Sequence, residues 1–287
     1  MSRPDGLRLA LAQPTIDPEA GEEARVNRAV GMIAQAGQQR ADLVLFPESY
    51  PGPITAGASY DAEEAVAAAC RDAGTAACWG RVEGDEKGGF ATVAYLTGRN
   101  GRRLERYVRS HPATGDVHPV LSGSAMVPGN ELGLFEFEGL KLGVTICSEL
   151  WSPEICRSLA LLGAEVLLAP AGGGFHRVAA NWQLIARARA IENELFVGLT
   201  QQLFEGETGS ALIAGPESVA GELTEPGLLI RDLDLTRSRW LRDHDDSMQE
   251  PKLFSSLPGL LRARRPGLYQ ALVEPAEDDY DFEADPD

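Results

Sequence analysis

Positive charge is scarce in this chain. Lys and Arg together number 26 against 43 Asp and Glu, so the formal net charge is −17. Nucleic acids and anionic membranes bind basic surfaces, so this balance argues against both as partners. Much of the acid lies in a carboxyl-terminal run that no Lys or Arg interrupts, comprising Glu274, Glu277, Asp278, Asp279, Asp281, Glu283, Asp285 and Asp287. We expect residues 273–287 to form an acidic tail that is either disordered in solvent or lies on a partner subunit.

Cysteine and long apolar runs are scarce too. The four cysteines stand at positions 70, 78, 147 and 156, with spacings that match no zinc motif. His111 and His118 have no acidic or cysteine partner at ligand spacing, and no phosphate loop or dinucleotide fingerprint occurs. The apolar run Leu7–Ala12 is too short for a signal peptide, and no run of ~18 apolar residues is present to span a membrane. These absences predict a cytoplasmic protein with reduced thiols and no metal or cofactor.

The remaining composition suits a folded chain. Hydrophobic residues make up 44% of the 287 positions, which is enough for a full core. This length fits one large domain or two domains of roughly 100–200 residues each. No internal repeat or low-complexity linker divides the chain before its acidic end. We therefore predict one domain over residues 1–272, followed by the tail.

Short apolar segments alternate with segments of helical periodicity. Strands are predicted over Leu7–Gln13, Asp42–Phe46, Ala76–Val82, Phe90–Leu96, Arg103–Val108, Leu132–Phe137, Leu140–Cys147, Val166–Ala169, Leu195–Gln201, Ser210–Ala214 and Leu228–Asp232. Helices are predicted over residues 18–40, Asp61–Gly74, Pro153–Leu162 and Ala179–Asn193. The strands are apolar enough to be buried on both faces, so the alternation predicts an α/β fold in layers.

Three of the predicted strand ends carry a chemically distinctive side chain. Glu48 follows the second strand, Arg109 follows the fifth, and Cys147 ends the seventh. Functional groups of α/β proteins gather where strands end in loops. We interpret the three strands as members of one sheet and predict that their terminal side chains converge on one cavity.

Each of these residues also has a purely structural interpretation. Cys147 alone fits a small apolar core position, Glu48 alone fits an acceptor for loop N–H groups, and Arg109 alone fits a surface ion pair. Together they form a coherent chemical set. A carboxylate can take the thiol proton, the sulfur can attack an amide or nitrile carbon, and a fixed cation can stabilise the negative charge that develops.

The segments around these residues resemble motifs of the nitrilase superfamily of carbon–nitrogen hydrolases. Members carry a catalytic Glu in a Pro-Glu pair after the second strand, a Lys between Tyr and His, and a Cys that is followed by an acid and a Pro-Glu pair. The matching runs stand in family order over about residues 7 to 235: Leu11-Ala12-Gln13-Pro14, Phe46-Pro47-Glu48-Ser49-Tyr50-Pro51-Gly52, Tyr107-Val108-Arg109-Ser110-His111, Pro128-Gly129, Cys147-Ser148-Glu149-Leu150-Trp151-Ser152-Pro153-Glu154, Arg187-Ala188-Arg189-Ala190-Ile191-Glu192-Asn193 and Gly209-Ser210.

The resemblance implies a four-layer α-β-β-α sandwich, packed face to face with a second copy in a homodimer or higher homo-oligomer. It implies that Glu48 is the general base and Cys147 the nucleophile. Arg109 stands where the family has its catalytic Lys, and Ser122 stands where many members carry a second Glu, with Asp116 the nearest acid. Arginine keeps its proton at any working pH, so Arg109 could stabilise an oxyanion but could not shuttle a proton, and Glu48 would carry both proton transfers.

These features predict a thiol-dependent hydrolase that cleaves the C–N bond of a small amide or N-carbamoyl compound through a thioester. Loops 50–60, 113–124 and 171–178 are expected to line its pocket. The substrate-binding candidates are Tyr50, Ser148, Glu149, Trp151, Gly173, Phe175 and His176, of which Glu149 is also expected to have a structural role. His176 and Arg177 either meet a substrate carboxylate or face solvent. The charged residues of 187–193 are expected to hold the fold. The alternative function is a catalytically impaired member of the fold that acts as a binding or scaffolding module.

Overall fold

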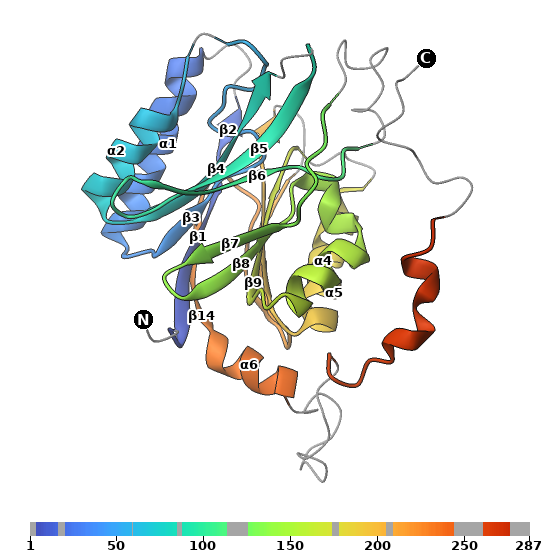
Figure 1. Ribbon diagram of the computed structural model, residues 1–287. Helices are drawn as coiled ribbons and strands as arrows, with labels where there is room; N and C mark the ends of the chain where they lie inside the picture. The colour runs from blue at the N-terminus through green and yellow to red at the C-terminus, as the bar shows by residue number, and fades with distance from the viewer. Residues whose placement is uncertain are drawn as a thin grey trace.

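The structure, a computed structural model, describes residues 4–16, 21–58, 60–84, 88–113, 126–173, 178–204, 209–243 and 261–275. Two six-stranded sheets lie face to face, and helices cover the outer face of each sheet (Figure 1). The result is an α/β fold with the four layers α-β-β-α, which confirms the fold class that the sequence motifs implied.

Each sheet contains three neighbouring parallel strands flanked by antiparallel ones. The first sheet has the order β14-β1-β3-β4-β5-β6. Its strands are Gly227–Asp234 (β14), Gly6–Gln13 (β1), Leu43–Leu45 (β3), Ala76–Gly84 (β4), Phe90–Thr97 (β5) and Arg103–Val108 (β6). The second sheet has the order β13-β12-β10-β9-β8-β7. Its strands are Val219–Leu223 (β13), Ala211–Ala214 (β12), Phe196–Gln201 (β10), Val166–Ala171 (β9), Leu140–Val144 (β8) and Gly133–Phe137 (β7). A short parallel pair joins β2 (Thr15–Ile16) to β11 (Leu203–Phe204).

The helices form the two outer layers. Helices α1 (Glu22–Gln38) and α2 (Glu63–Ala73) pack on the first sheet, and α4 (Pro153–Leu161) and α5 (Ala179–Asn193) pack on the second. Helix α6 (Leu235–Asp243) follows β14. The short 3-10 helices are η1 (Cys147–Trp151), η2 (Pro266–Leu268) and η3 (Gln270–Leu272). Among the helices in the described ranges, none combines the length and the apolarity needed to cross a bilayer.

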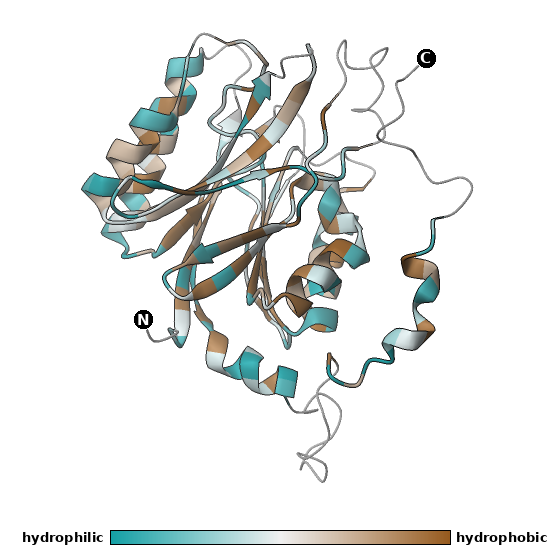
Figure 2. Ribbon diagram, viewed as in Figure 1, coloured by the Kyte–Doolittle hydropathy of each residue, from teal (hydrophilic) through white to brown (hydrophobic). Residues whose placement is uncertain are grey.

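Strand β1 contributes to two apolar clusters, one between the two sheets and one between the first sheet and its helices. Leu7, Leu9 and Leu11 point between the two sheets, whereas Ala10 and Ala12 point toward the helices. Side chains alternate along a strand, so a strand that is apolar at every position is buried on both faces. Brown strands at the centre and mixed colours on the helices show the same division in Figure 2. Removal of this apolar surface from water is the main force that holds the layers together.

Among the differences from the predicted elements, three concern β8, β13 and α6. Strand β8 ends at Val144 rather than at Cys147, because residues 147–151 coil into η1. Strand β13 and helix α6 were not predicted. The sequence of β13, VAGEL, contains Gly and Glu and leaves no buried position, and the sequence of α6, LTRSRWLRD, is dominated by polar residues. Neither segment has the apolar periodicity on which a prediction depends.

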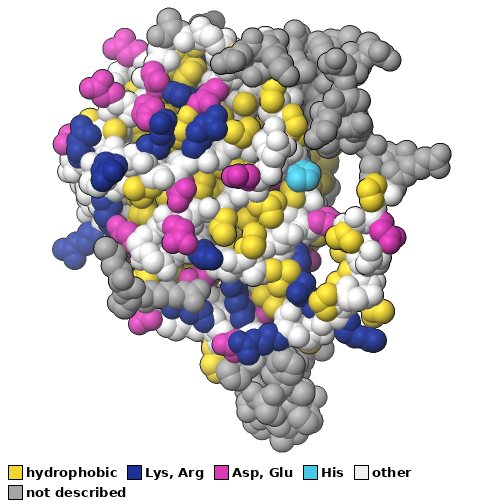
Figure 3. Space-filling view, in the orientation of Figure 1, with side chains coloured by type: hydrophobic (Ala, Val, Ile, Leu, Met, Phe, Trp, Pro, Cys, Tyr) yellow, Lys and Arg dark blue, Asp and Glu magenta, His cyan; other side chains and the backbone are white. Residues whose placement is uncertain are grey.

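The surface carries charges of both signs. On the face that Figure 3 shows, Lys and Arg side chains are interspersed with Asp and Glu. Many of these charges are paired, as where Arg99 meets Asp42 at 2.6 Å and Glu138 at 2.7 Å. Interspersed, paired charges of this kind form a solvated surface rather than a field of one sign.

Candidate active site

Glu48 stands in the loop that leaves β3 of the first sheet and meets the second sheet. Its N–H donates to the carbonyl of Ala171 at the end of β9, at 3.3 Å, and its carbonyl accepts a hydrogen bond from the side-chain amide of Gln202. The next residue, Ser49, has the left-handed φ of 52°. Ser49 packs so closely on Gly80 that a Cβ at Gly80 would lie 2.9 Å from the Ser49 nitrogen. Contacts from both sheets therefore fix the backbone of Glu48.

Arg109 follows β6 and turns its guanidinium inward. The residue is only 2% exposed. Nη1 lies 3.2 Å from Oε1 of Glu48, Nη2 donates to Oγ of Ser148 at 2.5 Å, and Nε donates to the carbonyl of His111 at 3.2 Å. A buried arginine needs acceptors for its N–H groups, and these contacts hold the plane of the guanidinium in one orientation.

Cys147 is the first residue of η1 and has a left-handed backbone, with φ 54°. Its side chain is partly exposed. Burial and the carboxylate of Glu48 raise the pKa of the Cys147 thiol well above its ordinary value, against the opposing effects of Arg109 and of the backbone N–H of Gly172. The thiol is therefore neutral at neutral pH, and a base must take its proton before or during an attack.

The three predicted residues come together, but from two sheets. Glu48 and Arg109 follow strands of the first sheet, whereas Cys147 follows β8 of the second. The prediction that all three strand ends belong to one sheet was therefore wrong. The site lies where the two sheets face each other, and the contact between Arg109 and Ser148 crosses from one sheet to the other.

Glu149 ties the Arg109 segment to the Cys147 segment. It is 0% exposed and accepts five hydrogen bonds. Oε1 accepts from the hydroxyl of Tyr107 (2.7 Å), the N–H and hydroxyl of Ser110 (2.8 and 2.9 Å) and the N–H of His111 (3.0 Å), and Oε2 accepts from the N–H of Ile146 (2.7 Å). The prediction of a substrate contact was wrong for this side chain, because protein donors surround a carboxylate without solvent access. Its expected structural role fits these contacts.

The chain from residue 8 to residue 243 matches the model of the carbon–nitrogen hydrolase family. The chain belongs to that family.

Relatives of this hydrolase are themselves described as hydrolases or amidases. The omega-amidase NIT2 of Xenopus tropicalis is 24% identical over 249 residues, which are 80% of this chain and 89% of the relative. A Pseudomonas protegens protein described as a hydrolase in the pqqF 5′ region is 30% identical over 239 residues, 76% of this chain and 81% of the relative. A mutant of the Nesterenkonia AN1 amidase from the nitrilase superfamily has a similar structure, with a TM-score of 0.71, 24% identity, and coverage of 94% of this chain and 98% of that one. The protein is thus an enzyme of the carbon–nitrogen hydrolase family, and it shares the fold of that amidase.

Two substrate-binding candidates of this hydrolase pack on other aromatic side chains. Tyr50 is 1% exposed, stacks on Phe46 with ring centroids 5.7 Å apart, and donates its hydroxyl to the carbonyl of Arg25 in α1 at 3.2 Å. The prediction was wrong for the Tyr50 side chain, because α1 covers it. Trp151 ends η1 and packs edge-to-face on Trp182 of α5, with centroids 5.4 Å apart.

The other candidates divide into two that lie near the thiol and two that fall outside the described residues. Ser148 follows Cys147 and contacts Arg109. Gly173 is partly exposed in the loop after β9. Phe175 and His176 lie outside the described residues, as do positions 114–125, which include Asp116 and Ser122. Within the described ranges, no group of three His, Cys, Asp or Glu is arranged to hold a metal ion.

Two residues that contact Cys147 or Glu48 were not among the predicted site residues. Gly172 directs its N–H to Cys147, and a Cβ at Gly172 would lie 3.3 Å from Oε2 of Glu48. A glycine run directly after an apolar strand was the available signal for such a close approach. Gln202, which holds the carbonyl of Glu48, carried no signal, because its partner is distant in sequence.

The α5 motif has the expected structural role. Nε and Nη2 of Arg189 donate to the carbonyls of Leu150 and Trp151, at 3.0 and 2.7 Å. These carbonyls end η1, so Arg189 anchors the short helix that begins at Cys147. The side chain of Asn193 donates back to the carbonyl of Arg189 at 3.0 Å.

Proposed function

We propose that this enzyme hydrolyses the C–N bond of a small amide or N-carbamoyl compound through a thioester on Cys147. The observation that carries the proposal is the contact between the Glu48 carboxylate and the Arg109 guanidinium, 3.2 Å apart, beside Cys147. Cys147 is a partly exposed residue. The description of relatives as omega-amidase and amidase favours an amide substrate. In this proposal Glu48 is the general base and acid, Cys147 the nucleophile, and Arg109 the fixed cation.

The reaction proceeds in two halves. The Cys147 thiol gives its proton to Glu48 as the sulfur attacks the carbonyl carbon, and the carbonyl oxygen becomes an oxyanion beside Arg109. The C–N bond breaks, Glu48 returns the proton to the departing nitrogen, and a thioester remains. Water then attacks the thioester and gives a proton to Glu48. The C–S bond breaks, the carboxylic product leaves, and the sulfur regains its proton from Glu48.

Arg109 has a purely electrostatic part in this scheme. A guanidinium does not release its proton at any working pH, so both proton transfers fall to Glu48. A preorganised cation at a developing oxyanion can lower the barrier by several kcal/mol, because it needs no reorganisation when the charge appears. The burial of Arg109 makes its charge act through little solvent.

The proposal is tested with a panel of small amides and N-carbamoyl compounds. We expect released ammonia or amine and, at short times, an acyl adduct on the intact protein that is detected by mass spectrometry. Cys147→Ala should abolish the adduct and reduce turnover at least ~1000-fold, and Glu48→Gln should reduce turnover about 100- to 10,000-fold.

Cys70→Ala is the matched control, because Cys70 is a buried thiol in α2, which packs on the outer face of the first sheet. It should leave both adduct and turnover unchanged. If the panel yields no product and no adduct, and Cys147 is unreactive, the alternative of a catalytically impaired binding or scaffolding module is favoured instead.

We also propose that the enzyme acts as a homodimer in a reducing compartment such as the cytoplasm. A reducing compartment keeps the nucleophilic thiol available. Support for self-association comes from exposed apolar side chains on the outer layer formed by α4 and α5, namely Leu161, Leu162, Leu184 and Ile191. Beside α4, residues 263–273 line a groove of about 680 Å³. Contiguous apolar surface of this kind marks interfaces between chains.

A further inference from the structure

Arg109 divides the arms of its guanidinium between two partners. Nη1 lies 3.2 Å from Oε1 of Glu48, whereas Nη2 donates to Oγ of Ser148 at 2.5 Å. Nε is held by the carbonyl of His111 at 3.2 Å. An arginine beside a carboxylate tends to close on it with both arms, in a bidentate pair. Here Ser148 takes one arm, so the contact with Glu48 in the structure runs through the other.

Ser148 is well placed to hold that arm. It lies one residue after the nucleophile in η1 and is partly exposed, whereas Ile146, Glu149 and Leu150 around it are buried. Because η1 is anchored by Glu149 and Arg189, the hydroxyl of Ser148 has a fixed position relative to the sulfur. Serine is also small, so it offers an acceptor at the site without filling the space that the guanidinium occupies.

We infer that Ser148 is a positioning residue, matched to Arg109, that keeps the guanidinium turned toward the oxyanion site and leaves one carboxylate oxygen of Glu48 available to the thiol. The inference rests on the proposed function. Oε2 of Glu48 lies on the side of Gly172, whose N–H is directed to the sulfur, and Oε1 lies on the side of Arg109. Without the hydroxyl, Nη2 loses its short partner, and the guanidinium closes on both oxygens of Glu48.

A lysine at position 109 would not need Ser148. Its Nζ reaches about as far as Cζ of an arginine. A lysine has no Nη2 group, so it has no second nitrogen that Ser148 would need to hold. The inference therefore predicts coupling: the hydroxyl of Ser148 matters when residue 109 is Arg and is dispensable when residue 109 is Lys. A double-mutant cycle measures this coupling directly.

The experiment compares four proteins, wild type, Ser148→Ala, Arg109→Lys and the double variant, with one amide from the panel. We expect Ser148→Ala to lower kcat about 10- to 100-fold in the Arg109 enzyme, with KM changed less than about threefold. In the Arg109→Lys background the same change should alter kcat less than about threefold. Ser152→Ala is the matched control, because the hydroxyl of Ser152 contacts Glu154 at the surface. It should leave kcat unchanged.

Three outcomes overturn the inference. Ser148→Ala retains more than half of kcat, or it lowers kcat equally in both backgrounds, or it raises KM while kcat stays constant, which would make Ser148 a substrate contact. If Ser148→Ala does not fold by circular dichroism, Ser148→Thr and Ser148→Val replace it. These two side chains have nearly the same shape, and only Thr keeps the hydroxyl, so Thr should retain the activity that Val loses.

A readout without turnover separates this inference from the proposed function. Arg109 opposes the upward shift of the Cys147 pKa, so a displaced guanidinium makes the thiolate rarer. Ser148→Ala should therefore slow the alkylation of Cys147 by iodoacetamide about three- to tenfold in the Arg109 protein and leave it unchanged in the Arg109→Lys protein. An inactive wild type would contradict the proposed function, whereas equal alkylation rates for wild type and Ser148→Ala would contradict the positioning role.

Discussion

Among the described non-glycine residues at the site, Cys147 and Ser49 have a left-handed backbone, at φ 54° and 52°. Side chains with a Cβ avoid this region, and each such residue costs on the order of 1–3 kcal/mol. Ser49 follows the proposed base, Glu48, and Cys147 is the proposed nucleophile itself. In both cases the sharp turn stops the chain from continuing along its strand direction. The side chains of Glu48 and Cys147 are thus held at the open end of the sheets rather than within the core.

The protonation of Cys147 provides a test at the residue scale. Burial and Glu48 raise its pKa above the ordinary value of 9.0. At pH 9.0 the thiol should therefore be less than half ionised, whereas an ordinary thiol would be half ionised at that pH. Glu48→Gln removes one of the effects that raise the pKa, so the ionised fraction at pH 9.0 should increase.

The measurement is the ultraviolet thiolate absorbance of each protein, corrected by the same protein carrying Cys147→Ala. The correction removes the contributions of Cys70, Cys78 and Cys156. A Cys147 thiol that is mainly ionised at pH 9.0, or that becomes less ionised in Glu48→Gln, would contradict the geometry described above.

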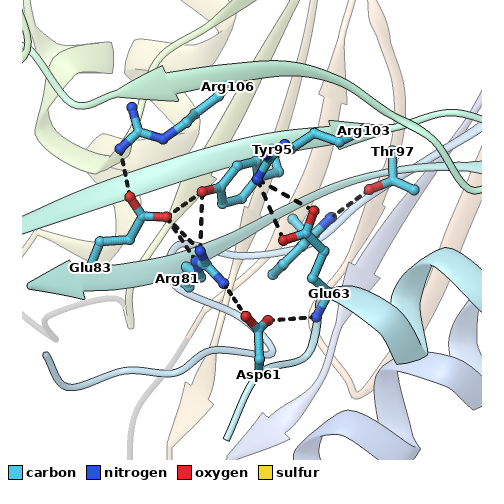
Figure 4. A network of polar contacts seen from close by, with 9 residues as sticks. Asp61, Glu63, Arg81, Glu83, Tyr95, Thr97, Arg103 and Arg106 are labelled. Carbon is cyan, nitrogen blue, oxygen red and sulfur yellow. Dashed lines mark hydrogen bonds and ion pairs between the residues drawn. The ribbon is translucent and has the colours of Figure 1, made fainter. Parts of the chain in front are cut away.

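At the scale of elements, a network of charges connects α2 with β4, β5 and β6 (Figure 4). Glu83 accepts from Arg106 at 2.5 Å, from Arg81 at 2.8 Å and from the hydroxyl of Tyr95. Arg81 continues to Asp61 at 2.8 Å, at the start of α2. Burial alone would raise the pKa of Glu83, but hydrogen bonds from Arg106, Tyr95 and Arg81 outweigh it and lower the pKa to about 2.

This network predicts a pH-dependent contribution to stability. A lowered folded-state pKa means that the ionised Glu83 stabilises the fold above its ordinary pKa of 4.5, and that this stability is lost as the pH falls toward about 2. Glu83→Gln should lower the free energy of unfolding by about 1–2 kcal/mol at neutral pH, a value reduced for the partial solvation of the group.

Urea denaturation of wild type and Glu83→Gln, at neutral pH and at acid pH just above the global acid transition, checks the sign. The difference between the two proteins should shrink as the pH falls below 4.5. A difference that is constant across this window would mean that the carboxylate has no charge-dependent part in joining the three strands.

At the scale of the whole molecule, the outer layers differ in how they meet solvent. Helices α4 and α5 leave large apolar side chains exposed, among them Leu184 and Ile191, which lie two turns apart on the same face of α5. Exposed apolar side chains of the segment 261–275, namely Leu268, Leu272 and Val273, line or border the neighbouring groove. This face is the one on which we propose that two copies pack.

A charge placed on that face tests the proposed homodimer. Ile191→Glu should weaken self-association at least ~10-fold, because a carboxylate is costly to bury in an apolar interface. The monomer should lose little stability, since the position is exposed. Sedimentation velocity over a range of protein concentrations gives the comparison. Leu104→Glu, at an exposed apolar position on β6 of the first sheet, is the control and should leave association unchanged. A monomeric wild type would contradict the proposal.

How far the sequence predicts this molecule depends on whether a feature is local. The central strands and four helices follow from apolar periodicity, and the boundaries of α5, Ala179–Asn193, are those predicted. The polar segments β13 and α6 have no such periodicity and were missed. Glu48, Arg109 and Cys147 were singled out because each follows an apolar strand. Tyr50 was misplaced because the sequence near Glu48 does not indicate which neighbours α1 covers.

The sequence by itself determined the layers and singled out the three residues that we propose to be reactive, since alternation of apolar residues and the order of short motifs are properties of the chain. Only the tertiary structure decided that the carboxylate and the guanidinium come from one sheet and the thiol from the other. It also decided that Glu149 holds the backbone of Ser110 and His111 and that Ser148 takes an arm of Arg109. These partners are distant in the chain, and their contacts exist only because burial of apolar side chains brings the two sheets together face to face.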